Sequence, residues 1–180
     1  MSRLAVWFHQ KDFALFNFIN HSCHHKYLDP FFRSFTHLGG ATCTISIALL
    51  FTMSAPAPYS FWAIDSLIAL TVSHIIVSII KKMYQRNRPY LTYPETKTIS
   101  KRLTDYSFPS GHTTAIFSIV TPFMLYMPSM AIYLFCLAGI VGLSRIYIGL
   151  HYPSDVLAGA FIGVGVGVIT VYLHSIVMVI

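Results

Sequence analysis

The sequence predicts an all-α protein, a polytopic membrane helix bundle of about five transmembrane helices with an N-terminal interfacial amphipathic helix. Of the 180 residues, 55% are hydrophobic and 10% are charged, and the mean hydropathy is +0.63. This composition is too apolar for a soluble domain with one core. Because one span takes about 20 residues, residues 1–180 suit a single membrane-embedded domain with no room for an appended soluble domain.

Residues 1–20 mix aromatic and charged side chains, with Trp7 and Phe8 close to Lys11 and Asp12. A cleavable signal peptide would need an uninterrupted apolar centre and a small-residue cleavage site. We therefore expect an amphipathic helix that lies in the membrane interface.

Histidines cluster directly after this helix, at His21, His24 and His25. A metal site is conceivable there, but an interfacial polar turn accounts for the spacing better. The cysteines are odd in number and show no CxxC spacing, so neither a zinc site nor a disulfide framework is expected. They are Cys23, Cys43 and Cys136.

The first two spans are expected at about 35–55 and 60–83, because the sequence Ala55-Pro56-Ala57-Pro58 interrupts a long apolar run. Asp65 and His74 lie in the second of them. Ionisable groups within a membrane are candidates for function. Here, however, Asp65 is close enough to the turn to be hydrated, and His74 can be a hydrogen-bonded packing residue.

The second span ends in a basic segment that leads to Pro89. Lys81 and Arg88 are seven residues apart, which would place them on one helical face about two turns apart before Pro89 ends the helix. We expect Lys82 and Arg86 to be a basic flank that anchors the helix at the headgroups.

A polar loop, residues 90–108, leads into Pro109-Ser110-Gly111-His112, and apolar sequence then continues to Tyr126. Serine is a strong N-cap, and Gly111 lets a ligand approach the backbone closely. The segment can therefore present free amide hydrogens to an anion. Ordinary capping of the third span is the alternative.

The fourth span is expected over about 130–147 and the fifth from Pro153 towards the C-terminus. The fifth contains small residues at four-residue spacing, which favour close helix packing in lipid. These are Gly159, Gly163 and Gly167.

Between these two spans lie Arg145, His151 and Asp155. With a helix that begins at Pro153, Asp155 falls in its first turn and can reach back to one imidazole nitrogen of His151. The other nitrogen is then available as a base or nucleophile. The alternative is that Asp155 is a helix-start acid favoured by the helix dipole.

The five spans bring three polar segments, 81–88, 109–112 and 144–155, to one membrane face, opposite the turns near 56–58 and 127–129. Together they offer three cations, a helix N-terminus, two histidines and an aspartate. Such a set can bind a phosphate and supply a nucleophile and an acid.

These segments resemble the three signature motifs of the type 2 phosphatidic acid phosphatase superfamily, which also includes vanadium haloperoxidases. The motifs are Lys81 to Arg88-Pro89, then Pro109-Ser110-Gly111-His112, then Ser144-Arg145 to His151 and Asp155. They occur in the family's order and spacing, and the resemblance covers at least residues 81–155.

The resemblance implies that His151 is a nucleophile that forms a phosphohistidine, that Asp155 orients it, and that His112 protonates the leaving oxygen. It also implies a phosphate-binding set that works with no metal and no other cofactor. This set comprises Lys81, Arg88, Ser110, Gly111 and Arg145.

The implied activity is hydrolysis of a lipid phosphate monoester, such as phosphatidate or phosphatidylglycerophosphate, with membrane lipids and no nucleic acid as partners. Undecaprenyl-diphosphate hydrolysis is the alternative, although some short enzymes of that type carry an acid where this chain has Gly111. A haloperoxidase and a catalytically silent scaffold are less favoured, and the oligomeric state stays open.

Orientation in the membrane gives two conflicting expectations. All twelve Lys and Arg residues lie on the motif side of the five-span arrangement, so the positive-inside rule places that side in the cytoplasm. Three of these cations belong to the phosphate-binding set, which biases the count. The resemblance implies a bacterial cell-membrane enzyme with an extracytoplasmic active site, and this is the orientation that we expect.

Overall fold

The computed structural model describes residues 3–99 and 103–179, and every regular element in these ranges is helical. The all-α fold class is therefore confirmed. The α-helices are α1 Arg3–Asn17, α2 Leu28–Phe35, α3 Ala41–Ser54, α4 Tyr59–Met83, α5 Pro89–Thr92, α6 Gly111–Tyr126, α7 Ala131–Tyr147 and α8 Pro153–Val179. Three short helices join some of them: the π-helix η1 Phe18–Ser22 and the 3₁₀-helices η2 Thr36–Gly39 and η3 Pro128–Met130.

Three helical stretches of the described residues are long and apolar enough to cross a membrane: Tyr59–Met83, Pro128–Tyr147 and Pro153–Val177. The pair Leu28–Gly39 and Ala41–Ser54 is bent by 54° and makes a fourth crossing if the pair forms one span. The remaining expected span corresponds to α6, which has only 16 residues.

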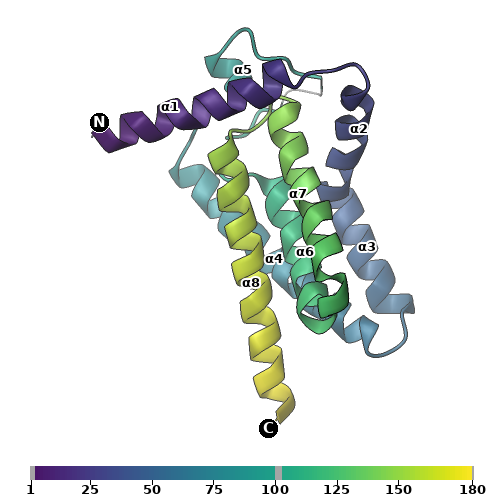
Figure 1. Ribbon diagram of the computed structural model, residues 1–180. Helices are drawn as coiled ribbons and strands as arrows, with labels where there is room; N and C mark the ends of the chain where they lie inside the picture. The colour runs from purple at the N-terminus through teal and green to yellow at the C-terminus, as the bar shows by residue number, and fades with distance from the viewer. Residues whose placement is uncertain (1–2, 100–102, 180) are drawn as a thin grey trace.

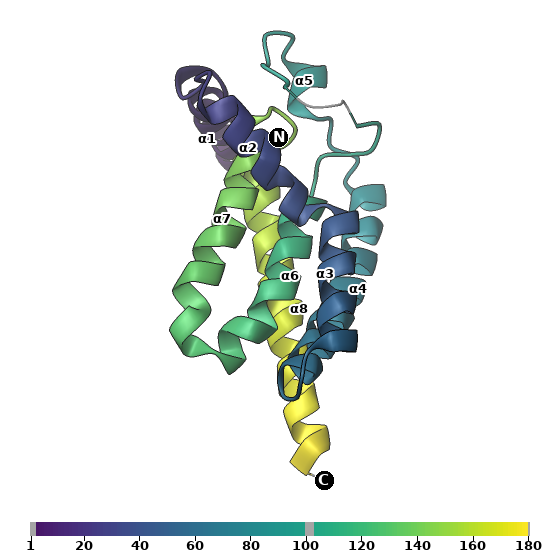
Figure 2. The same cartoon turned by 90° about the vertical axis from the view of Figure 1, so that its right-hand side faces the viewer.

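α6 is the central helix of the bundle. It packs against α4, α7 and α8, and Figure 2 shows it between α7 on one side and α3 and α4 on the other. Residues 113–122 of α6 are all buried. The apolar side chains of this helix thus pack against other helices.

The glycines of α8 let it approach α6 closely, as the four-residue spacing predicts. A Cβ atom added at Gly163 would lie 2.6 Å from the carbonyl oxygen of Thr114 and 2.7 Å from Cβ of Phe117. At Gly159 it would lie 2.7 Å from the carbonyl oxygen of Ser110. The packing of α8 therefore fixes the start of α6, where a predicted anion-binding segment lies.

One end of the bundle gathers the polar segments. α1 crosses this end, and α2, α5 and the α7–α8 loop lie there too, while the α3–α4 and α6–α7 turns lie at the opposite end (Figure 1). α1 buries Phe16 and exposes Leu4, Trp7 and Phe8. An apolar exposed face on a helix across the bundle end agrees with the expected interfacial helix.

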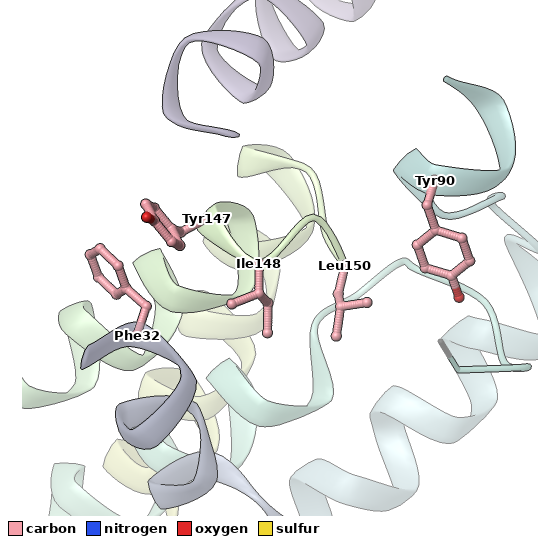
Figure 3. Packing of buried hydrophobic residues seen from close by; sticks show 5 residues of the cluster. All are labelled: Phe32, Tyr90, Tyr147, Ile148 and Leu150. Carbon is pink, nitrogen blue, oxygen red and sulfur yellow. The ribbon is translucent and has the colours of Figure 1, made fainter. Parts of the chain in front are cut away.

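The α7–α8 loop is held by a buried cluster and by Asn20. The cluster consists of Phe32, Tyr90, Tyr147, Ile148 and Leu150 (Figure 3). The Asn20 amide donates to the carbonyl oxygens of Tyr147 and Lys97, at 2.8 and 2.9 Å. At Gly149 the chain turns with φ +80°, where a Cβ would lie 2.6 Å from the carbonyl oxygen of Lys97. This anchoring positions His151, which follows two residues later.

Candidate active site

A cavity of about 940 Å³ opens beside α3 and α4 and reaches the polar end of the bundle. Its polar part is lined by predicted site residues from all three motifs, together with Asp105. These residues are Lys81, Arg88, Gly111, His112, Arg145 and His151. The remainder, which we call the apolar groove, is lined by Ile45, Leu67, Leu70, Ile75 and Val77, among others.

His151 is buried, and its two ring nitrogens face groups of opposite charge. Nε2 lies 3.1 Å from Nη1 of Arg88, and Nδ1 lies 3.5 Å from Oδ2 of Asp155. A guanidinium can only donate, so Nε2 is the acceptor and a neutral ring carries its proton on Nδ1, towards Asp155. This tautomer leaves the Nε2 lone pair for attack once Arg88 moves away.

The protonation state of His151 follows from its surroundings. Burial, and then the positive charges of Arg88, Arg145 and Lys81, lower the pKa of His151 well below its usual range. The imidazole is therefore neutral at physiological pH, which is the form a nucleophile needs.

Asp155 lies behind His151, fully buried, and both its oxygens have partners. Oδ2 accepts a hydrogen bond from the backbone N–H of Tyr152 at 2.9 Å. Oδ1 accepts one from Nη1 of Arg86 at 2.7 Å. The backbone of Asp155 also accepts from the N–H of Ser110 at 3.0 Å, which ties α8 to the start of α6.

Lys81 and Arg88 approach each other, but not as the sequence predicts. α4 ends at Met83, and Arg88 lies in extended backbone just before α5, so the prediction of one shared helical face is wrong. The two side chains meet because both bind the carboxylate of Asp105, through Lys81 Nζ and through Arg88 Nη2. The loop that carries Asp105 thus replaces the helix as the scaffold.

Asp105 is a site residue that sequence reasoning missed. Partial burial alone would raise its pKa, but the hydrogen bond from Lys81 and the charges of Lys81 and Arg88 lower the pKa of Asp105 to about 2. Its carboxylate is therefore an anion bound where two cations of the predicted phosphate-binding set meet. The sequence holds one signal for it, an acid in the polar loop four residues before Pro109.

Arg145 completes the cation cluster, by which we mean Lys81, Arg88 and Arg145. Its side chain is buried, and Nη1 donates to the hydroxyl of Thr36 at 2.6 Å. Nε and Nη2 are buried with no hydrogen-bond partner. Buried unpaired donors are costly, so the two unpartnered guanidinium nitrogens of Arg145, a residue that lines the cavity, indicate a site for an anion.

The residues of the second motif lie in two different surroundings: some line the cavity and one is buried beside it. Gly111 and His112 line the cavity, and a Cβ at Gly111 would meet nothing within 4 Å. Ser110 is the N-cap of α6, as expected, but makes no capping hydrogen bond with its side chain. It is buried, and its hydroxyl accepts from the Thr113 hydroxyl at 2.9 Å.

Two ionisable residues of α4 have separate surroundings. Asp65 is buried and binds Nδ1 of His174 at 2.8 Å and the hydroxyl of Tyr126 at 2.7 Å, which cross-links α4, α8 and α6 near the end opposite the polar segments. His74 lines the cavity. In residues 3–99 and 103–179, no group of three or more His, Cys, Asp and Glu side chains could hold a metal ion.

The chain is similar in sequence and in fold to known proteins. A family model described as "PAP2 superfamily" matches residues 62–178. Similar curated proteins include the bacitracin transport permease protein BcrC of Bacillus licheniformis, 38% identical over 101 residues, which are 56% of this chain and 50% of that protein. An undecaprenyl-diphosphatase of Sulfolobus acidocaldarius is 29% identical over 113 residues, 62% of this chain and 55% of that protein.

The chain thus spans about half the length of these curated relatives. Among solved structures, the crystal structure of Aquifex aeolicus LpxE matches with a TM-score of 0.78 at 28% identity. The match covers 89% of this chain and 94% of that one.

Proposed function

Because this chain belongs to the PAP2 superfamily, we propose that it is an integral membrane phosphatase that hydrolyses a lipid phosphate monoester of the phosphatidate or phosphatidylglycerophosphate type. One observation carries the proposal. A neutral His151, a second histidine and the cation cluster line the polar part of a cavity whose remainder is the apolar groove. The polar part suits a phosphoryl group and the groove suits a hydrocarbon chain.

In the first step, Nε2 of His151 attacks phosphorus as the bond from phosphorus to the lipid oxygen breaks. His112 gives its proton to that oxygen, and the lipid alcohol leaves. His112 shares the cavity with three cations, which disfavour its protonated form, and the negative phosphoryl oxygens of bound substrate offset these charges and favour that form. Asp155, 3.5 Å from Nδ1, stabilises the positive charge that the ring gains.

In the second step, a water oxygen attacks phosphorus and passes a proton to His112. The phosphorus–nitrogen bond breaks, its electron pair returns to Nε2, and phosphate leaves. Both histidines then have their starting protonation states, so the cycle balances.

The cation cluster stabilises the phosphoryl oxygens in both steps. The unpartnered Nε and Nη2 of Arg145 can bind a phosphoryl oxygen without displacing another group. Arg88 and Lys81 are bound to Asp105, so the phosphoryl group takes the place of that carboxylate. Three fixed cations and a helix N-terminus supply the charge that a metal ion would otherwise provide, and we therefore propose a metal-independent reaction.

Hydrolysis of undecaprenyl diphosphate is the second candidate, favoured by the relative named undecaprenyl-diphosphatase. Gly111 favours the monoester, because some short enzymes of the diphosphatase type carry an acid at this position. A Cβ there would meet nothing within 4 Å, so the position has room for a side chain. The choice of glycine is thus not forced by packing.

A substrate panel tests the proposal. The protein in detergent is given phosphatidate, phosphatidylglycerophosphate, undecaprenyl diphosphate and a water-soluble phosphate monoester, with and without EDTA, and phosphate release is measured. We expect a higher kcat/KM for the phospholipid monoesters and no effect of EDTA. Preference for the diphosphate would select the second candidate, and loss of activity in EDTA with recovery in magnesium would refute the metal-independent mechanism.

We also propose that the protein resides in the cell membrane with the cavity on the extracytoplasmic side. Support comes from the family resemblance and from the position of three cations, since Lys81, Arg88 and Arg145 line the cavity. Phosphate binding explains why they lie on that side, so they are left out of the charge count that the positive-inside rule uses.

A further inference from the structure

A partly buried ion-pair network outside the cavity joins α1 to the candidate catalytic carboxylate. Arg86, between α4 and α5, is its centre. Nη1 of Arg86 donates to Oδ1 of Asp155 and to the hydroxyl of Ser154, both at 2.7 Å. Nη2 donates to Oδ2 of Asp12 in α1 at 2.7 Å. The expectation that Arg86 anchors the helix at the headgroups is therefore wrong, because its guanidinium points into the protein.

Asp12 is fixed as firmly as Arg86. Its Oδ1 accepts from the backbone N–H of Ser154 at 2.8 Å, and its Oδ2 accepts from the Ser154 hydroxyl at 2.6 Å. The carboxylate thus caps the first turn of α8 while it binds Arg86. The Tyr152 ring lies against the guanidinium, with 3.9 Å between Cζ of Arg86 and the ring centroid.

Arg86 gives Asp155 something that no other described contact supplies. The backbone N–H of Tyr152 binds Oδ2, and Oδ2 is also the oxygen nearest to His151 Nδ1. Nη1 of Arg86 donates to Oδ1, and the Ser107 side chain also hydrogen-bonds the carboxylate. Arg86 is the arginine that forms an ion pair with it. It therefore restricts the rotation of the carboxylate and supplies a positive charge that favours the ionised form of Asp155.

We propose that Arg86 and Asp12 are positioning residues for the reaction: Asp12 holds Arg86, Arg86 holds Asp155, and Asp155 holds His151. Neither Arg86 nor Asp12 lines the cavity, so they act through Asp155 and not on the phosphoryl group. The docking of α1 is thereby part of the active site. This inference rests on the proposed function, since it names residues of the same site.

The alternative is that the network only attaches α1 to the bundle. α1 also docks through apolar contacts, because Phe16 is buried against Tyr152 and Ile146 and Phe13 stacks on Tyr93 with 4.0 Å between ring centroids. A purely structural network would therefore affect stability and leave turnover by the folded protein unchanged.

The test compares Arg86→Met and Asp12→Asn with wild type, using the full chain in detergent and the best substrate of the panel. We expect kcat to fall about 10- to 100-fold for Arg86→Met, as for other groups that orient a catalytic side chain, with KM changed less than about 3-fold. Asp12→Asn should act in the same direction and less strongly. The controls are Lys11→Gln and Gln85→Ala, exposed neighbours outside the network, which should match wild type.

Two further readouts separate positioning from attachment. Because Asp12 acts through Arg86, adding Asp12→Asn to Arg86→Met should lower kcat by less than the single change does in wild type. The acid limb of the kcat profile should move to higher pH in Arg86→Met, because Asp155 then lacks its cation and keeps His151, the Tyr152 backbone and the Ser107 side chain as partners. Arg86→Lys, which keeps the charge but not the forked geometry, should recover part of kcat.

The outcomes are distinct. A fall in kcat with unchanged KM supports the proposal, as does partial recovery in Arg86→Lys if Arg86→Met does not fold. Wild-type kcat in folded Arg86→Met, or in Arg86→Lys and Asp12→Asn together, would overturn it while leaving the proposed function intact. A wild-type protein inactive on every lipid phosphate would instead refute the proposed function, and this inference with it.

Discussion

Arg88 uses all of its N–H donors within the protein. Nε binds the carbonyl oxygen of Asp105, Nη1 binds Leu150 and His151, and Nη2 binds Tyr106 and the Asp105 carboxylate. A guanidinium has five such donors, so none is left for a phosphoryl oxygen. Asp105 therefore competes with the substrate for Arg88 and Lys81.

We expect Asp105→Asn to tighten inhibition by vanadate, which resembles the five-coordinate phosphoryl group, by about 3- to 10-fold. A neutral amide releases the two cations more readily than a carboxylate does, because charge-assisted hydrogen bonds are about twice as strong as neutral ones. The inhibition constant measures the effect, with Glu95→Gln, an exposed acid of the same loop, as control. Weaker inhibition in Asp105→Asn would show that Asp105 shapes the cation cluster rather than competing for it.

The lowered pKa of His151 predicts the pH dependence of turnover. Its folded-state pKa lies below the usual value of about 6.5, so the ring stays neutral as the pH falls through that value. The pKa of the free protein is reported by kcat/KM, which should hold its plateau there and decline only at lower pH. A midpoint near 6.5 on the acid side would mean that His151 titrates as an exposed histidine.

Single residues differ in how far the sequence predicts them. The motif residues that line the cavity follow from local chemistry, since a cation or a histidine beside a proline or glycine stands out in apolar sequence. Asp105 and Arg86 do not, because their roles depend on partners brought close only by the fold. Arg86 and Asp12, for example, are 74 residues apart in the sequence.

Helices were predictable where an apolar run ends in a turn. α4 and α8 begin and end close to the expected positions, and α8 starts at Pro153. The span expected at 35–55 is wrong in its first part, where the chain bends by 54° before α3. The bend follows from tertiary contacts: a Cβ at Gly39 would lie 2.6 Å from the carbonyl oxygen of His112, and Thr36 binds Arg145.

Close packing between α8 and α6 gives a prediction at the level of helices. Gly163→Ala should destabilise the protein by about 1–3 kcal/mol, because its Cβ would meet the backbone of α6 at 2.6 Å and cannot be accommodated by a side-chain rotation. Gly165→Ala is the matched control, because a Cβ there meets nothing within 4 Å. Thermal unfolding in detergent should show a lower Tm for Gly163→Ala only, and equal Tm values would contradict the packing role.

For the whole molecule, the proposed orientation is tested by cysteine labelling in a background in which Cys23, Cys43 and Cys136 are alanine. Glu95→Cys lies in an exposed part of the loop at the cavity end, and Ser129→Cys lies in the exposed α6–α7 turn at the other end. In intact cells, a membrane-impermeant maleimide should label Glu95→Cys and not Ser129→Cys. The reverse pattern would place the cavity in the cytoplasm.

The central claim is that His151 carries the phosphoryl group during turnover. Wild-type protein is mixed with a lipid phosphate that carries radioactive phosphorus, quenched in alkali, and digested. The label should be alkali-stable, acid-labile and confined to the peptide that contains His151. It should be absent from His151→Ala, whose turnover should fall by several orders of magnitude, and present in His9→Ala, an exposed histidine of α1. Label retained in His151→Ala, or none in wild type during active turnover, would contradict the account.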